Sequence, residues 1–327
     1  MEDVIMSNRL NIIFLGKKLN NPIMTASGCF GYGLEYKDYF NPNELGAAVL
    51  KGITMEPRNG NAGTRIVETP SGMLNSVGLE NPGIEEFKKI IPSIKKELNI
   101  PLVANINGKI LEEYIEIARE VEQLVEIEMV ELNISCPNVK DGGMAFGANP
   151  EMARLVTREV RKVLTKPMIV KLSPNVTNIV EIAKIVEEEG ANGIALINTL
   201  LGMAIDIRNR KPILGNIMGG LSGPAVKPVA LRMIYQVSQA VSIPILGMGG
   251  ISSTEDAIEF IMVGASAISL GTGMFSNPRL PIEIKKGLKK YCIENNIDNI
   301  SDIVGAAHPD GGIAYRNRLG GNYEIKS

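Results

Sequence analysis

Two lysine residues each end a short apolar run, and their side chains are candidates for chemistry. Lys51 follows Ala47–Leu50, and Lys171 follows Met168–Val170. We expect both ammonium groups in a partly desolvated environment, where a lysine needs an anionic partner. The two interpretations are a lysine that forms a Schiff base and a lysine that balances the charge of a bound cofactor.

Amide side chains lie at or near the ends of other short segments: Asn75, Asn105, Asn133, Asn138 and Asn198. A row of amides suits a flat ligand that is rich in N–H and C=O groups. Flavin mononucleotide (FMN) is such a ligand, and its reduced ring carries negative charge that lysines would balance. A Schiff-base lysine does not explain the amides.

Glycine pairs indicate a phosphate site. Gly249-Gly250 follows the apolar run Ile245–Met248 and precedes a predicted helix that Ser252, Ser253 or Thr254 would cap. Backbone N–H groups and the helix dipole would then point at one spot, and Gly271-Thr272 would complete the cradle. The alternative is a pair of glycine-rich turns without a ligand.

Cys136 lies in the segment NISCPNVKDGGMAFG, on a predicted loop that could act as a lid. Its thiol could be a nucleophile or a base, and the alternative is a small buried hydrophobic residue. The sequence has a single histidine, His308, far along the chain, so a Cys–His dyad is poorly supported. The other cysteines, Cys29 and Cys292, are predicted to be structural thiols, and no metal site is expected.

The elements that must position these residues alternate between short apolar runs and amphipathic stretches of helical period. The predicted strands are Ile23–Thr25, Ala47–Leu50, Leu102–Ala104, Met129–Ile134, Met168–Leu172, Gly193–Ile197, Ile245–Met248 and Ala267–Leu270. The predicted helices are Ile84–Leu98, Leu111–Val125, Pro150–Leu164, Asn178–Glu189, Pro228–Val241, Thr254–Val263 and Pro281–Asn295. The pattern predicts an α/β fold, a (β/α)8 TIM barrel, whose active site lies at the carboxyl ends of the strands.

Two segments lie outside this alternation. Leu10–Leu19, with Gly16-Lys17 at its middle, predicts a β-hairpin over the amino-terminal mouth of the barrel. We expect residues 1–305 to form one FMN-binding barrel domain. Residues 306–327, rich in Gly, Asn and Arg, are expected to be an irregular and loosely held carboxyl-terminal extension.

Composition excludes several other classes of protein. The 327 residues carry 34 Lys and Arg against 36 Asp and Glu, a net charge of -2, so no global basic field would hold nucleic acid or an anionic membrane. No apolar stretch has the length of a membrane span, and the amino terminus lacks the pattern of a signal peptide, so a cytoplasmic protein is expected. The 34 glycines indicate many tight turns of the kind that surround a ligand.

Four motifs together resemble the dihydroorotate dehydrogenases, most closely the catalytic subunit of the NAD-linked, type B branch of class 1. They are NSVGLENPG (Asn75–Gly83), NISCPN (Asn133–Asn138), INTLLGM (Ile197–Met203) and GGLSGPAVKPVALR (Gly219–Arg232). The resemblance covers residues from about Leu10 to Val304. It implies a barrel with one FMN per chain that oxidises dihydroorotate to orotate in the biosynthesis of pyrimidines (UMP).

The resemblance also implies site residues. The FMN contacts would be Ser27, Lys51, Gly52, Asn105, Asn133, Lys171, Ile197, Gly223, Gly249, Gly250, Gly271 and Thr272. The substrate contacts would be Lys51, Asn75, Ser76, Val77, Gly78, Leu79, Asn133, Asn198 and Thr199. Cys136 would be the catalytic base that removes the carbon-5 proton while hydride passes from carbon 6 to the flavin.

A partner subunit carrying FAD and a 2Fe-2S cluster would pass the electrons to NAD, in a heterotetramer built on a homodimer of this chain. Three alternatives remain at this point. They are a fumarate-linked type A enzyme, a flavoenzyme similar to dihydropyrimidine dehydrogenase, and a barrel retained as a binding or assembly subunit without redox activity.

Overall fold

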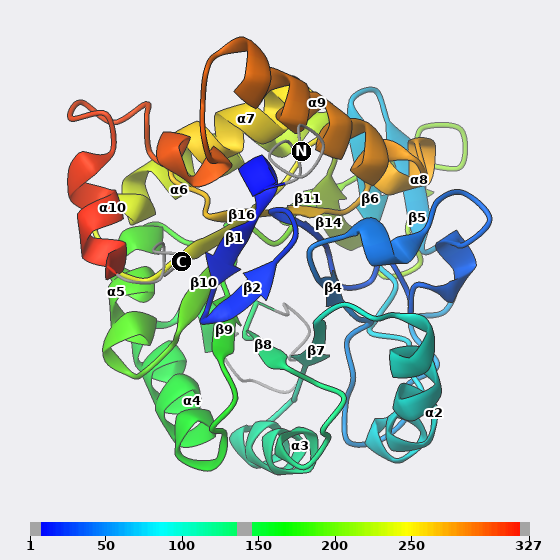
Figure 1. Ribbon diagram of the computed structural model, residues 1–327. Coiled ribbons are helices and arrows are strands. Elements are labelled where there is room, and N and C mark those ends of the chain that lie inside the picture. The colour runs from blue at the N-terminus through cyan, green and yellow to red at the C-terminus, as the bar shows by residue number, and fades with distance from the viewer. Residues whose placement is uncertain (1–7, 136–145, 321–327) are drawn as a thin grey trace.

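Eight parallel strands form the central sheet of the computed structural model, which describes residues 8–135 and 146–320 (Figure 1). The strands are β3 (Ile23–Thr25), β4 (Ala48–Val49), β7 (Leu102–Ile106), β8 (Met129–Asn133), β9 (Met168–Lys171), β10 (Gly193–Leu196), β15 (Ile245–Met248) and β16 (Ala267–Leu270). Their order in the sheet is β3-β16-β15-β10-β9-β8-β7-β4. Every strand predicted for the barrel is present, so the predicted TIM barrel is confirmed.

The two ends of this sheet meet at a seam between β3 and β4. Met24 forms an isolated parallel bridge with Ala47. The Thr25 hydroxyl accepts a hydrogen bond from the Val49 N–H group (3.0 Å) and donates one to the Val49 carbonyl (3.1 Å). A side chain therefore completes the hydrogen bonding that closes the barrel.

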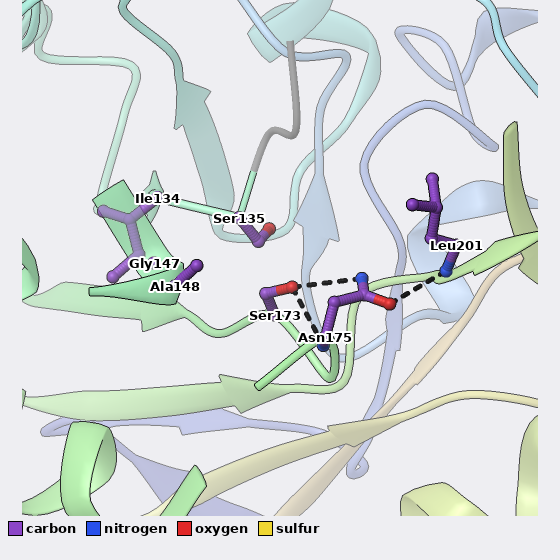
Figure 2. A pocket seen from close by; sticks show the side chains of 7 residues that line it. All are labelled: Ile134, Ser135, Gly147, Ala148, Ser173, Asn175 and Leu201. Atoms are coloured by element: carbon purple, nitrogen blue, oxygen red, sulfur yellow. Dashed lines mark hydrogen bonds between the residues drawn. The ribbon is translucent and has the colours of Figure 1, made fainter. Parts of the chain in front are cut away.

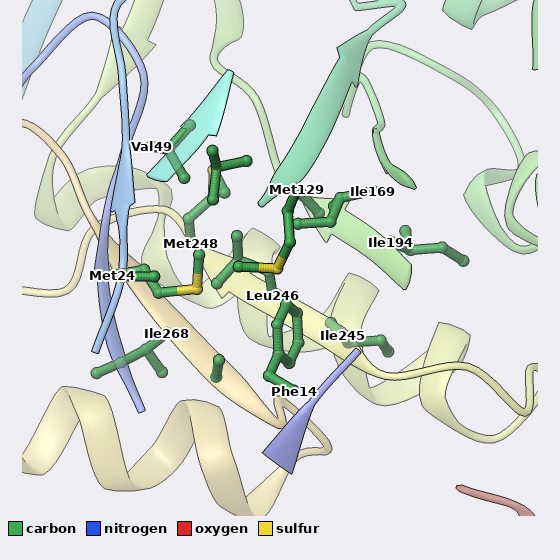
Figure 3. Close-up of a cluster of buried hydrophobic side chains, with 14 of the residues drawn as sticks. Phe14, Met24, Val49, Met129, Ile169, Ile194, Ile245, Leu246, Met248 and Ile268 are labelled. Carbon is green, nitrogen blue, oxygen red and sulfur yellow. The ribbon is translucent and has the colours of Figure 1, made fainter. Parts of the chain in front are cut away.

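The barrel strands are buried along their whole length, which explains why the sequence shows continuous apolar runs in place of alternation. Met24, Met129 and Met248 are among the buried side chains drawn in Figure 3, together with β-branched residues such as Val49 and Ile268. Branched side chains favour the extended backbone, and the flexible thioethers of methionine fill irregular gaps between them.

Helices surround the strands as an outer ring (Figure 1). They are α2 (Ile84–Glu97), α3 (Leu111–Glu122), α4 (Pro150–Val163), α5 (Ile179–Glu188), α6 (Lys227–Ser238), α7 (Thr254–Met262), α8 (Gly273–Ser276) and α9 (Leu280–Glu294). Short 3-10 turns lie at Asn8–Leu10, Leu34–Tyr36, Pro42–Glu44, Phe146–Ala148, Pro224–Val226 and Ile300–Ile303. None of the helices in the described ranges has a stretch long and apolar enough to cross a bilayer.

The predicted amino-terminal hairpin is present as β1 (Ile12–Phe14) and β2 (Lys17–Leu19). Leu15 packs against Gly193, the first residue of β10, so the hairpin covers the amino-terminal ends of the strands. Phe14 is fully buried and points toward Leu246 within the core (Figure 3).

A second sheet, absent from the sequence-based prediction, stands at the other end of the barrel. It is antiparallel, in the order β11-β14-β6-β5, and comprises β5 (Ile66–Thr69), β6 (Gly72–Asn75), β11 (Leu200–Met203) and β14 (Met218–Ser222). Strands β12 (Ile205–Asp206) and β13 (Lys211–Pro212) form a further short hairpin. These strands are short, rich in glycine and half-exposed, so no buried apolar run reveals them.

The carboxyl-terminal extension is more regular than the expected irregular, loosely held tail. Residues Ile313–Leu319 form helix α10, and Tyr315 is only 1% exposed. Arg318 donates hydrogen bonds to the carbonyls of Ser238 (2.8 Å) and Val241 (3.3 Å), at the end of α6. Arg316 also donates to the Val304 carbonyl (2.7 Å), so two guanidinium groups and the buried Tyr315 ring hold the helix. Its seven residues span only about two turns, which is too short for a helical period to be read from the sequence. The domain boundary after residue 305 stays a prediction.

Candidate active site

The carboxyl ends of the barrel strands gather most of the predicted site residues at one mouth. Asn105 lies on β7, Asn133 ends β8 and Lys171 ends β9, and the exposed fractions of these three residues are 1%, 8% and 5%. Ser27, Lys51 and Gly52 follow β3 and β4, while Ile197, Asn198 and Thr199 follow β10. Because the strands are parallel, all these residues lie at the same end of the barrel.

Three of the amides in this mouth form a buried hydrogen-bonded row. Asn107 Nδ2 donates to Asn105 Oδ1 (2.7 Å), and Asn133 Nδ2 donates to Asn107 Oδ1 (2.8 Å). The Ser135 hydroxyl donates to Asn133 Oδ1 (2.6 Å), and Asn198 donates to that hydroxyl. The row therefore runs from the carboxyl-terminal part of β7 to the loop after β10. Asn107 and Ser135 were not singled out by sequence reasoning.

A glycine is required beside this row. A Cβ atom on Gly52 would lie 2.7 Å from both Asn105 Oδ1 and Asn107 Nδ2. The backbone after β4 therefore passes directly over the two amides. This observation explains Gly52 by close approach rather than by backbone conformation, because its φ is not in the left-handed region.

Lys171 is buried without a hydrogen-bonded partner among the described residues. Its Nζ lies 3.7 Å from Oε1 of Glu131, which is itself fully buried on β8. An ammonium group this deep with one distant counter-charge can accept an additional anionic ligand. Lys51 is half-buried and is placed by its backbone N–H group, which donates to the Gly31 carbonyl (3.0 Å).

The predicted phosphate cradle has unused donors. The backbone N–H groups of Gly249, Gly250, Gly271 and Thr272 donate to no acceptor within residues 8–135 and 146–320. Gly223 lies against Gly250, since a Cβ on Gly250 would be 2.7 Å from the Gly223 carbonyl oxygen. Buried or half-buried N–H groups are normally paired, so four unpaired donors after two adjacent strands indicate an anion site.

The helix that follows the glycine pair already has a carboxylate at its amino terminus. Ser253 caps α7 by accepting from the Asp256 N–H group (3.1 Å). Asp256 in turn accepts from the Ser252 N–H and hydroxyl groups, at 2.8 Å each, and pairs with Lys227 at 2.6 Å. The free N–H groups for an anion are therefore those of the glycine loops and not those of Ser252.

The predicted substrate segment 75–79 begins at the end of β6 and leaves it by a strained turn. Asn75 Nδ2 donates to the Gly220 carbonyl (3.3 Å), and the Ser76 hydroxyl accepts from Asn61 Nδ2 (3.0 Å). Gly78 has φ +81° and Leu79 has φ +55°, so two consecutive residues adopt the left-handed conformation. The second sheet thus positions Asn75, Ser76, Val77, Gly78 and Leu79.

A small pocket of about 70 Å³ opens beside the amide row (Figure 2). Its lining includes Ser135, Ser173, Asn175 and Leu201. Asn175 Nδ2 donates to Ser173 Oγ (3.2 Å) and to the Thr199 carbonyl (3.0 Å), and its Oδ1 accepts from the Leu201 N–H group (2.9 Å). Asn175 therefore joins the loop after β9 to the loop after β10. Ser173 and Asn175 lie two and four residues after Lys171, the last residue of β9, so the strand-end rule that singled out Lys171 also applies to them.

The predicted base and one predicted amide, Cys136 and Asn138, lie outside the described residues. Of the other thiols, Cys29 lies near Gly271, where a Cβ on the glycine would be 3.5 Å from its Sγ. Burial raises the pKa of Cys29 to about 11, against a smaller lowering by the charge of Lys171. Cys29 is therefore a protonated thiol at neutral pH, and Cys292 is buried in α9.

Comparison with known proteins gives the chain clear relatives. The family model of dihydroorotate dehydrogenase matches residues 9–292. A protein of Brachyspira hyodysenteriae named dihydroorotate dehydrogenase B (NAD(+)), catalytic subunit, is 59% identical over 303 residues, which are 92% of this chain and 99% of the relative. Proteins of the same name are 56% identical in Desulforamulus reducens, over 88% of this chain and 95% of the relative, and 53% identical in Alkaliphilus metalliredigens, over 91% and 98%.

Proposed function

Because the chain belongs to the dihydroorotate dehydrogenase family, we propose that the mouth of its barrel holds FMN and dihydroorotate side by side. The chain is an oxidoreductase that oxidises dihydroorotate to orotate in pyrimidine biosynthesis, as an NAD-linked catalytic subunit. The observation that carries this conclusion is the 59% identity over 99% of the relative's length.

The described residues fit an FMN phosphate and ring. The four unpaired N–H groups at Gly249, Gly250, Gly271 and Thr272 would hold the phosphate, with Gly223 beside them. Lys171, buried and without a hydrogen-bonded partner in the described part of the chain, would face the polar edge of the ring. The remaining proposed contacts to FMN are Ser27, Lys51, Gly52, Asn105, Asn133 and Ile197.

The proposed substrate site lies where the amide row meets the second sheet. Asn133 and Asn198 reach it from the barrel, and Asn75 and Thr199 meet around Gly220 of β14. Lys51 supplies a positive charge for the substrate carboxylate. The segment 76–79 would complete the contacts, and the left-handed backbone at Gly78 and Leu79 would turn its N–H groups toward the substrate.

FMN, when bound, supplies an acceptor for the hydride that leaves carbon 6 of dihydroorotate. We assign removal of the carbon-5 proton to Cys136. A free thiol has a pKa of about 8.5, closer to neutrality than a serine hydroxyl, so modest tuning makes it a competent base. The amides hold the planar substrate, and Lys51 and Lys171 balance negative charge in the mouth.

A catalytic subunit implies a separate partner subunit. We propose that the partner carries FAD and a 2Fe-2S cluster and that two copies of this chain form the core of a heterotetramer. Exposed apolar side chains on the second sheet and its hairpin support a surface that another protein covers. Leu201, Met203 and Met218 are 52%, 47% and 48% exposed, and Ile205 beside them is 50% exposed.

An anaerobic titration of the purified chain with dihydroorotate tests the proposal. We expect a yellow protein whose flavin absorbance bleaches with one equivalent of dihydroorotate and is restored by NAD only when the partner subunit is present. Reoxidation by fumarate alone would assign the chain to the type A branch. Reaction with dihydrouracil but not dihydroorotate would support the dihydropyrimidine alternative, and a colourless protein that takes up no FMN would contradict any redox role.

A further inference from the structure

Glu131 is a carboxylate buried in the middle of a barrel strand. The residue has 0% exposure on β8, between the apolar residues Val130 and Leu132. One oxygen, Oε2, has no hydrogen-bond partner within the described residues. Burying a carboxylate in this way costs free energy of folding unless the charge is paired with a neighbouring group. Glu131 is not among the residues proposed above to contact FMN or substrate.

The neighbour of Glu131 is the lysine that faces the proposed flavin ring. Its Oε1 lies 3.7 Å from Lys171 Nζ, and the two side chains are 0% and 6% exposed. In a buried environment two charges at this separation influence each other and any third charge strongly. Glu131 therefore offsets part of the positive field that Lys171 presents to the mouth of the barrel.

Glu131 also ends the hydrogen-bonded amide row. Asn105 Nδ2 donates to Glu131 Oε1 (2.5 Å), and each following donor, from Asn107 through Asn133 and Ser135, points back along the row toward Glu131. A carboxylate can only accept hydrogen bonds, whereas an amide can be turned either way. An acceptor at this end fixes the amide orientation of Asn105, and through it those of Asn107 and Asn133.

We propose that Glu131 is a positioning residue of the active site, which lowers the reduction potential of bound FMN by offsetting Lys171 and orients the amides that contact FMN and substrate. This inference rests on the proposed FMN site. A negative charge beside Lys171 makes reduction to a negatively charged ring less favourable, and this bias helps electrons leave toward the partner subunit.

The test uses FMN-loaded protein and removes the charge of the Glu131 side chain while keeping the shape of that side chain. For Glu131→Gln we expect the two-electron equilibrium constant for reduction of bound FMN to rise at least tenfold, a positive shift of about 30 mV or more. The matched control is Glu128→Gln, which removes a carboxylate paired with Lys95 (2.6 Å) just before the same strand. This control should lose stability without moving the potential, which separates a positioning role from a merely structural one.

Two further variants keep the inference testable if Glu131→Gln does not fold. Glu131→Asp keeps the charge and should shift the equilibrium constant by less than about threefold. Asn107→Ala interrupts the amide row but leaves Glu131 and Lys171 in place, and should raise the KM for dihydroorotate about tenfold with an unchanged potential.

Three outcomes would overturn the inference. They are an unchanged potential in Glu131→Gln, a shift in Glu131→Asp as large as that expected for Gln, and an unchanged KM in Asn107→Ala. A wild-type chain that binds no FMN would instead overturn the proposed function itself. A chain that binds and reduces FMN normally while Glu131→Gln has no effect would overturn only the role of Glu131.

Discussion

The hydroxyl of Thr25 closes the barrel by bonding both backbone groups of Val49, accepting from its N–H and donating to its carbonyl. The contact joins β3 to β4 at a seam that also holds the isolated bridge between Met24 and Ala47 and a hydrogen bond from the Gly46 N–H group to the Ile23 carbonyl (2.8 Å). Thr25 and Val49 are fully buried, so these backbone groups have no contact with bulk water.

We therefore predict that Thr25→Val destabilises the protein by about 2–4 kcal/mol, because it leaves a buried donor and a buried acceptor without partners. The free energy of unfolding in urea measures the effect. Thr157→Val is the matched control: Thr157 is also fully buried, but its hydroxyl has no partner among the described residues. That change should cost less than about 0.5 kcal/mol, and equal losses in the two variants would contradict the role of the seam.

The assignment of Cys136 predicts a kinetic effect. Cys136→Ala should slow reduction of bound FMN by dihydroorotate about 10²- to 10⁴-fold at neutral pH in anaerobic stopped-flow measurements. Cys136→Ser should recover part of the rate as the pH rises, because a serine hydroxyl has a much higher pKa than a thiol and loses its proton only at higher pH.

Cys29→Ala is the control for this experiment. The pKa of Cys29 is raised to about 11 by burial, so its thiol stays protonated at neutral pH and cannot be the base. The rate of FMN reduction by dihydroorotate in Cys29→Ala should stay within about twofold of the wild-type rate. Unimpaired reduction in Cys136→Ala would remove Cys136 from the mechanism.

A methyl group in the proposed phosphate cradle should weaken FMN binding. Gly250 has φ +89°, and a Cβ there would lie 2.7 Å from the Gly223 carbonyl oxygen. We predict that Gly250→Ala raises the Kd for FMN, measured by flavin fluorescence, at least about tenfold, since it displaces N–H donors to an anion.

Gly16→Ala separates this effect from backbone strain. Gly16 has φ +74° in the turn between β1 and β2, and a Cβ there meets nothing within 4 Å. Both variants pay the strain of a left-handed alanine, about 1–2 kcal/mol, but only Gly250→Ala should lose FMN. Equal affinities would place the phosphate elsewhere.

The ion pair at the start of α7 should make stability depend on pH. Burial alone would raise the pKa of Asp256, but hydrogen bonds from Lys227 and Ser252 outweigh this effect of burial. The pKa of Asp256 is therefore lowered from its ordinary value of 3.8. The folded state therefore binds this proton less readily than the unfolded chain, so the stabilisation is complete above the unfolded pKa and is lost as the pH falls through the lower folded pKa.

Asp256→Asn should cost about 2 kcal/mol at pH 7, and the difference from wild type should shrink as the pH falls below 3.8. Glu259→Gln is the control, because Glu259 contacts the same Lys227 at 2.7 Å but is 48% exposed. It should cost less than about 0.5 kcal/mol. A deficit in Asp256→Asn that persists undiminished at acidic pH would contradict the assignment.

The sequence predicts the barrel well because its strands are buried on both faces and read as continuous apolar runs. Lys171 and Asn133 are predictable for the same reason, since each is the polar residue that ends such a run. The second sheet is not predictable in this way, because strands such as β14 (Met218–Ser222) are half-exposed and rich in glycine.

Contacts between strands explain what sequence reasoning missed within the site. Asn107 matters because parallel pairing of β7 with β8 brings it to Asn133, and no local pattern encodes that register. Glu131 carried a usable signal, a charge in the middle of the apolar run MVELN, but its partners Asn105 and Lys171 come from two different neighbouring strands.

The pairing of β3 with β16 has a consequence for how the protein is made. Ile23 is aligned with Ile268, so the first strand of the barrel takes its hydrogen-bonded neighbour from the last. A ribosome releases β3 early, and its edge then stays open until nearly the whole chain has been synthesised. Until that moment the unpaired edge of β3 is exposed to chaperones and to other nascent chains. The exposure ends when β16, the final strand, pairs with β3.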